Sequence, residues 1–129
     1  MPRPASSQPT EVELQILGVL WERGASTVRE VHQALAKQRD TGYSTTLKMM
    51  QVMLQKGLVR RDDSVRPQMY RAAKSQKRTQ AQMLDDFTRK AFHGSAMRLV
   101  MRMVSSGQLS AEDLAEIQRL AQNSDGEQE

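Results

Sequence analysis

The chain has 129 residues, a formal net charge of +4 and no cysteine. This length accommodates one ordinary domain, or a small domain with an oligomerisation region, and excludes two large independent domains. The lack of cysteine in the sequence excludes disulfide scaffolds, thiolate metal sites and cysteine nucleophiles. No run approaches the ~20 apolar residues of a membrane span, and the N-terminal segment has no apolar signal region, so we expect a soluble, cytoplasmic protein without membrane contact.

Charge is unevenly distributed along the chain. Residues 1–82 contain 14 Lys and Arg against 7 Asp and Glu, whereas residues 83–129 contain 5 against 8. A basic front half favours a polyanionic partner, and an acidic rear half would be repelled by that partner. We therefore expect the rear half to have a different task.

Two capping-box spacings predict the first helices. Residues 1–9 are rich in proline and are predicted to form a mobile tail. Thr10 and Glu13 then predict a helix over about 11–22, which stops at Gly24. Thr27 and Glu30 repeat the spacing and predict a second helix over about 28–38.

The third helix is predicted to begin at Ser44 or Thr45 and to end at Gly57 in a left-handed cap. Its apolar spacing predicts a buried stripe made of Leu47, Met50 and Leu54. Residues 58–61 and 68–72 then contain strand-forming residues on either side of a polar turn. They predict a two-stranded hairpin with a basic tip.

Helical spacing returns after residue 75, in three segments separated by Gly94 and Gly107. Each segment has one apolar stripe and is too short to form its own core, so the stripes are predicted to pack on a second copy of the chain. The residues predicted at this dimer interface are Leu84, Phe87, Met97, Val100, Val104, Leu114 and Ile117.

The predicted fold is mainly α with a small β-hairpin: a winged helix-turn-helix followed by a three-helix dimerisation region. We place the DNA-binding domain at 10–73, the dimerisation domain at 75–122, and a mobile acidic tail at 123–129. In a winged helix the third helix enters the DNA major groove, and the hairpin reaches the backbone or the minor groove.

The third helix has an unusual outward side when Leu47 is placed at the centre of the buried stripe. That side carries a hydroxyl, two apolar groups and cations. These groups suit contacts with a base edge, a thymine methyl and phosphates, respectively. An alternative interpretation is that Met49 and Val52 only widen the core stripe. The residues predicted to contact DNA from this helix are Ser44, Thr45, Thr46, Lys48, Met49 and Val52, with Lys56 near the same side.

Seven cations lie between residues 60 and 78, against two carboxylates. Alternation in a strand places Arg60 and Arg61 on opposite faces, so one of them is not expected to touch DNA. Arg66, at the hairpin tip, is the predicted wing contact.

No sequence pattern for catalysis is found. The chain has no phosphate-binding glycine loop, and its two histidines, His32 and His93, form no metal-binding spacing. We expect no metal, no cofactor and no enzymatic activity, with the histidines in packing or capping roles. Two alternatives to a specific repressor remain: a winged-helix protein-interaction module with only non-specific DNA binding, and a small helical hydrolase.

Several short motifs follow one another along the chain. The front motifs are residues 13–21 (ELQILGVLW), 26–32 (STVREVH), 42–46 (GYSTT), 55–61 (QKGLVRR) and 70–72 (YRA), and the rear motifs are 94–95 (GS), 99–100 (LV) and 109–114 (LSAEDL). Together they resemble the bacterial penicillinase-repressor family of the BlaI/MecI type over about residues 9–122. The resemblance implies a homodimeric repressor that binds a dyad operator and blocks transcription. An upstream sensor protein is a further partner that only the resemblance implies.

The chain departs from this family in two places that concern release from DNA. Members cut by a sensor protease carry an Asn-Phe pair where this chain has Arg102 and Met103. Copper-responsive members carry C-terminal cysteines, which this sequence lacks. The resemblance therefore implies neither cleavage at this bond nor release through thiolates, and the inducing signal stays open.

Overall fold

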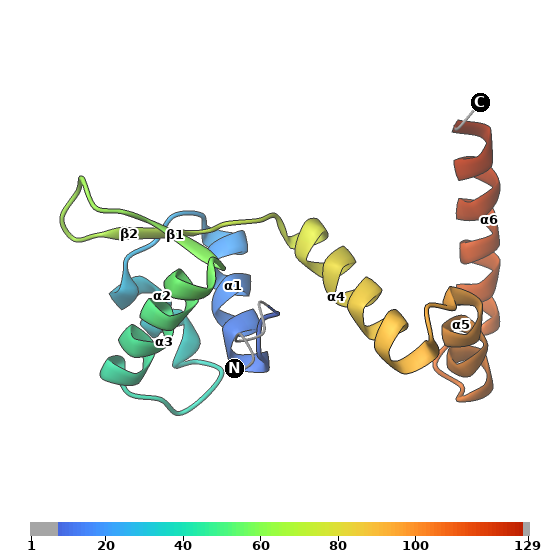
Figure 1. Cartoon of the computed structure of the whole chain (residues 1–129), viewed down its shortest axis with the longest axis horizontal. Helices are drawn as coiled ribbons and strands as arrows, with labels where there is room; N and C mark the ends of the chain where they lie inside the picture. Colours follow the sequence, from blue (N-terminus) through green and yellow to red (C-terminus); the bar gives the residue numbers. More distant parts are fainter. Residues whose placement is uncertain (1–7, 128–129) are drawn as a thin grey trace, which may run out of the picture. The chain divides into compact units, whose positions relative to one another are not determined.

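The computed structural model describes residues 8–127 as six helices and one two-stranded antiparallel hairpin (Figure 1). This order confirms the predicted fold class, a winged helix-turn-helix followed by a helical region. None of the helices in this range combines the length and apolar character needed to span a bilayer. The elements are α1 (Glu11–Arg23), α2 (Val28–Leu35), α3 (Tyr43–Lys56), β1 (Val59–Asp62), β2 (Met69–Ala72), α4 (Gln76–Phe92), α5 (Ala96–Ser105) and α6 (Ala111–Glu127).

Both predicted capping boxes are confirmed. The Thr10 hydroxyl accepts a hydrogen bond from the Glu13 amide at 3.2 Å, and the Glu13 carboxylate accepts from the Thr10 amide at 2.9 Å. Thr27 and Glu30 form the same reciprocal pair at 3.1 and 2.9 Å. Each box satisfies amides that the first turn of a helix leaves unpaired. α2 is shorter than predicted because the Gln38 amide bonds to the carbonyl three residues back, which closes a tight final turn.

α3 begins earlier than predicted. Its N-cap is Gly42, whose extended backbone (φ −85°, ψ 159°) precedes the first helical residue, so Ser44 and Thr45 lie inside the first turn and do not cap it. The other end agrees with the prediction. Gly57 has the left-handed conformation (φ 80°, ψ 15°) that residues with a Cβ rarely adopt, and its amide bonds back to the last turn.

The hairpin is anchored to the helices along one edge. Arg60 lies opposite Arg71, and Arg61 opposite Tyr70. A backbone bridge joins Tyr70 to Ser26, between α1 and α2, with hydrogen bonds of 2.8 and 2.9 Å. This single bridge ties the segment before α2 to the wing.

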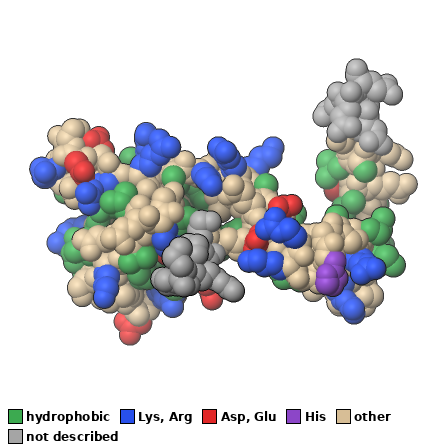
Figure 2. Space-filling model, in the orientation of Figure 1, with side chains coloured by type: hydrophobic (Ala, Val, Ile, Leu, Met, Phe, Trp, Pro, Cys, Tyr) green, Lys and Arg blue, Asp and Glu red, His purple; other side chains and the backbone are tan. Residues whose placement is uncertain are grey.

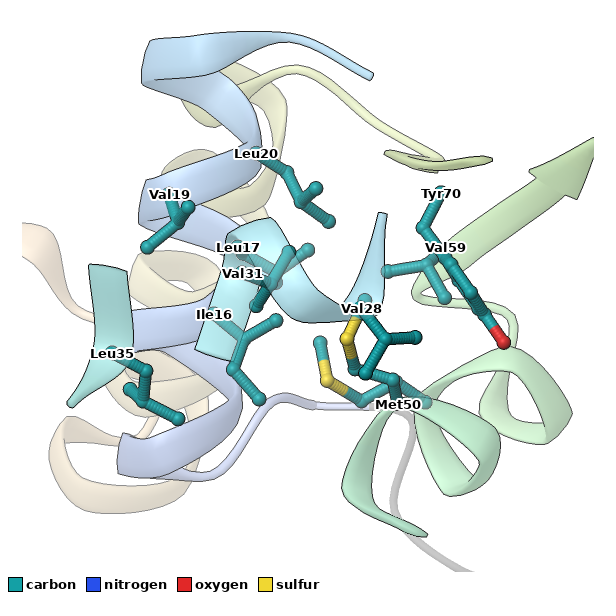
Figure 3. Close-up of a cluster of buried hydrophobic side chains, with 11 residues drawn as sticks. Ile16, Leu17, Val19, Leu20, Val28, Val31, Leu35, Met50, Val59 and Tyr70 are labelled. Atoms are coloured by element: carbon teal, nitrogen blue, oxygen red, sulfur yellow. The ribbon is translucent and has the colours of Figure 1, made fainter. Parts of the chain in front are cut away.

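One apolar cluster holds this region together. Figure 3 shows side chains from α1, α2, α3 and the hairpin converging, with Tyr70 and Val59 closing the cluster on the hairpin side. Burying each large apolar side chain contributes about 1.5–3 kcal/mol, so this set suffices for a small independent core. The buried apolar residues are Ile16, Leu17, Val19, Leu20, Val28, Val31, Leu35, Met50, Met53, Val59 and Tyr70.

The chain divides into two compact units, Met1–Met83 and Leu84–Glu129. The first of these units includes the start of α4, residues 76–83. Trp21 Nε1 donates to the Lys74 carbonyl at 2.9 Å, and Thr79 is buried. α6 continues to Glu127, so residues 123–127 of the predicted acidic tail are helical, and residues 128–129 lie outside the described residues. Residues 1–7, most of the predicted N-terminal tail, lie outside the described residues.

Candidate nucleic-acid interface

The buried side of α3 differs from the predicted one. Thr46, Met50 and Met53 are fully buried, whereas Leu47 and Leu54 are only half-buried. At 100° per residue, this turns the core direction by roughly 70° from the one predicted. The opposite side then consists of six exposed residues: Ser44, Thr45, Lys48, Gln51, Val52 and Gln55.

Most of the residues predicted to contact DNA lie on this exposed side. Ser44, Thr45 and Lys48 are exposed, and Val52 is 41% exposed. Met49 is half-buried and packs against the apolar cluster, as the alternative interpretation of this residue had it. The exposed side therefore offers hydroxyls, amides, one cation and one apolar group.

Thr46 is a correction to the predicted set. Its side chain is fully buried, and Thr46 Oγ1 lies 2.9 Å from His32 Nδ1 on α2. A side chain in this position joins the two helices of the helix-turn-helix and is not available to a base edge. Thr46 was predicted to contact DNA as a hydroxyl at the start of the helix, but its burial depends on a partner 14 residues away in the sequence.

Lys56 is the second correction on this helix. It does not lie on the outward side but donates from Nζ to Glu13 Oε1 at 2.7 Å. Glu13 is 6% exposed, and burial by itself would raise its pKa. The Lys56 ammonium and the Thr10 amide outweigh burial and hold the pKa of Glu13 below its usual 4.5. This ion pair fixes the end of α3 to the start of α1.

The beginning of α3 is fixed by aromatic contacts. The Tyr43 ring packs edge-on against the His32 ring at 5.7 Å, and the Arg29 guanidinium lies 5.3 Å from the Tyr43 ring centroid. A cation over an aromatic face contributes about 0.5–1 kcal/mol when exposed. Contacts at both ends thus set the orientation of α3 relative to α1 and α2.

The hairpin tip carries Arg66 as predicted. The side chain is exposed, and its Nη1 donates to the carbonyls of Asp63 and Val65 at 2.6 and 3.0 Å. An arginine has five donor hydrogens, so Nε and Nη2 remain available to a phosphate or a base. Arg61, in contrast, is bound to the Asp63 carboxylate.

A shallow groove connects α3 with the wing. Residues from the start of α2, from α3 and from the hairpin line it together. Gln51 contributes from α3, and Arg61 and Gln68 contribute from the hairpin side. Gln51 and Gln55 were not predicted to lie on the outward side, because both fall outside it when the buried stripe is centred on Leu47. Recognising Met53 in place of Leu54 as a core residue would have found them.

The residues predicted at a dimer interface are all exposed in the single chain. All of them lie in the second unit, Leu84–Glu129. Among the described residues of this unit, no apolar side chain is buried. Their exposed fractions range from 38% at Leu114 to 67% at Met97. The full set is Leu84, Phe87, Met97, Val100, Val104, Leu114 and Ile117.

Comparison with protein-family models matches residues 9–123 to the penicillinase repressor family. The chain belongs to this family. Its members are DNA-binding transcriptional repressors of the winged helix-turn-helix type and are not enzymes, so the hydrolase alternative is excluded. A comparison with individual curated proteins gives no match. Family membership implies operator DNA as the partner of this chain.

Proposed function

We propose that this penicillinase-repressor family member acts in the cytoplasm as a homodimer that binds a dyad-symmetric operator through α3 and the wing. The exposed side of α3 carries the proposal. It places Thr45, Lys48 and Val52 beside one another on a helix that is fixed at both ends. Hydroxyl and amide groups suit base edges, Val52 suits a thymine methyl, and Lys48 suits a phosphate.

The first turn of α3 adds to this surface. A helix N-terminus carries a partial positive charge and unpaired amides, which favour phosphate contact. Ser44 and Thr45 lie in this turn and add exposed hydroxyls. Arg66 is the proposed wing contact, since its tip position and free donors suit the backbone or the minor groove.

The rear unit supports dimerisation. The seven apolar residues predicted at the interface are exposed, and each would contribute about 1.5–3 kcal/mol if an identical unit covered it fully. The net negative charge of this half of the chain disfavours direct DNA contact. A second copy is the occupant proposed here, and joining two reading units on one dyad raises their effective concentration on the DNA.

Repression is proposed to follow from occupancy of the promoter, with release by a shift between two dimer states. The chain has Arg102 and Met103 at the positions that match the cleavage pair of protease-released relatives. An inducing ligand or sensor protein would then act by binding one dimer state better than the other.

The test compares a dyad operator taken from the promoter region of the protein's own gene with a scrambled duplex of equal composition. Footprinting locates the dyad, and fluorescence anisotropy measures both affinities at the same salt concentration. A specific repressor binds its operator at least about 10³-fold more tightly than non-specific DNA. Equal affinity for the two duplexes would support the alternative, a protein-interaction module with only non-specific DNA binding.

A further inference from the structure

The outer side of the hairpin carries a charge arrangement that α3 and Arg66 do not explain. Val59 and Tyr70 point into the core, so Arg60 and Arg71, one residue along each strand, point away from it. These two arginines are direct cross-strand partners. Like charges directly opposite each other in an antiparallel pair are destabilising, unless an anion lies across both.

The positive charge continues beyond β2. Lys74, Lys77 and Arg78 are all exposed and follow Arg71 along the chain into the first turn of α4. Figure 2 shows Lys and Arg side chains over the hairpin and the start of α4. The backbone of this stretch is held to the winged unit, because Ala73 N donates to Leu58 O at 3.0 Å and Trp21 Nε1 donates to Lys74 O. These five cations form what we term the outer basic surface: Arg60, Arg71, Lys74, Lys77 and Arg78.

The positive charge of this surface is largely unneutralised. Within the described part of the chain, no hydrogen bond or ion pair is made by the side chains of Arg60, Lys77 and Arg78, and Lys74 donates only to the neutral amide of Gln82 at 3.1 Å. Asp62 lies on the same face of the hairpin as Arg71; it accepts hydrogen bonds from Ser64 and interacts electrostatically with Arg71. Among the described residues, no ion pair neutralises any of the five cations.

We infer that the outer basic surface binds the sugar–phosphate backbone of DNA that flanks the operator, beyond the base pairs read by α3. The inference rests on the proposed operator binding. Arginines on a flat strand face have no protruding element to carry them to base edges, whereas phosphates present a continuous row of negative charge. An acidic protein is the other polyanion that would fit, and it is an outcome of the test below.

The consequence is measurable as salt dependence. Each phosphate contact contributes about 0.9 to the slope of log affinity against log salt. If two of these cations per protomer contact phosphates on both half-sites, four contacts are lost in the double variant Arg60→Gln/Arg71→Gln. Between 50 and 200 mM salt the wild type should then lose about 150-fold more affinity than the variant. The double variant Lys77→Gln/Arg78→Gln should show the same reduction in salt dependence.

The experiment uses the full chain and two duplexes. One ends at the outer base pairs of the dyad, and the other extends it by about one helical turn on each side. The control variant Arg89→Gln/Lys90→Gln removes the same charge from cations that already pair with Asp86 at 2.8 and 2.9 Å. Thermal melts verify that each variant is folded.

We expect the wild type and the control to bind the longer duplex more tightly than the short one, and each basic-surface variant to gain less affinity from the added flanks. Unchanged salt slopes in these variants, or an equal loss in the control, would overturn the inference while leaving operator binding intact. If the wild type bound polyglutamate and bound the two duplexes equally tightly, the surface would be assigned to an acidic protein partner. That result would also overturn the inference. Failure of the wild type to prefer the short dyad over a scrambled duplex would instead refute the proposed function.

Discussion

Replacing Lys56 with methionine tests how α3 is held in place. The Glu13 and Lys56 side chains are 8% and 17% exposed, so their ion pair is largely shielded from water. Removing one partner from a fully buried pair costs about 3–5 kcal/mol, because the other charge is left without compensation. Glu13 keeps its hydrogen bond from the Thr10 amide, so we expect Lys56→Met to lower the free energy of unfolding by about 2 kcal/mol at pH 7. Glu13→Gln should lower the free energy of unfolding by less than Lys56→Met does, since the freed Lys56 ammonium is able to turn toward solvent.

The pH dependence of this effect has a definite sign. The folded state holds the pKa of Glu13 below its usual 4.5, so the pair stabilises the protein above that pH. This contribution is lost as the pH falls through the lower folded value. The stability difference between wild type and Glu13→Gln should therefore shrink below pH 4.5. Lys56→Met removes the main group that lowers this pKa, so the pKa of Glu13 in the folded state should be higher in this variant than in the wild type.

Urea unfolding followed by the fluorescence of Trp21, the single tryptophan, reports on the winged unit. Arg23→Met is the matched control, because Arg23 and Glu30 form a solvent-exposed pair at 3.2 Å, and such pairs contribute little to stability. If Lys56→Met destabilised the protein no more than Arg23→Met, or if its effect were the same at pH 3 and pH 7, the ion pair would not be what fixes α3.

Four further predictions concern the core, the reading surface, the rear unit and release. Thr46→Val should destabilise the protein by about 1–2 kcal/mol by leaving His32 without its partner, with operator specificity unchanged; a shift in base preference would return Thr46 to the interface. Thr45→Ala should weaken operator binding by about 1–3 kcal/mol and relax specificity at one base pair, whereas Lys48→Ala should weaken all duplexes alike; anisotropy on single-base operator variants separates the two. A chain that ends at Met83 should keep its fold, sediment as a monomer and bind the full dyad poorly; a dimer in sedimentation would refute the proposed role of the rear unit. Protein from induced cells should run as an intact chain on a gel, and a fragment ending at Arg102 would show proteolytic release.

Features set by neighbouring residues were predictable from the sequence. The capping boxes at Thr10 and Thr27 depend on side chains three residues apart, and the C-terminal cap at Gly57 depends on one residue's freedom to adopt a positive φ. The hairpin followed from two strand-forming runs separated by a polar turn. These interactions form within one or two turns of chain, so a single sequence contains them.

Features that depend on distant partners were not predictable in the same way. Thr46 is buried because His32 accommodates its hydroxyl, and Lys56 points inward because Glu13 lies 43 residues away in sequence. Leu54 and Met53 are both apolar, and only the packing of α3 on its neighbours decides which one enters the core. The outward side of α3 is defined by the direction of the core, so an error in that direction shifts it. For this reason Gln51 and Gln55 were not predicted there, whereas Thr45 and Lys48 were.

The two units differ in how each becomes stable, and this difference bears on regulation. The winged unit has its own apolar cluster, whereas no apolar side chain is buried among the described residues of the rear unit. In the proposed dimer, much of the rear unit's stability would come from its partner, so its folding would depend on protein concentration. A signal that weakens this interface would lower operator affinity by separating two reading units that each remain folded. Release would then need no change in α3, and the same DNA contacts would form again when the signal is removed.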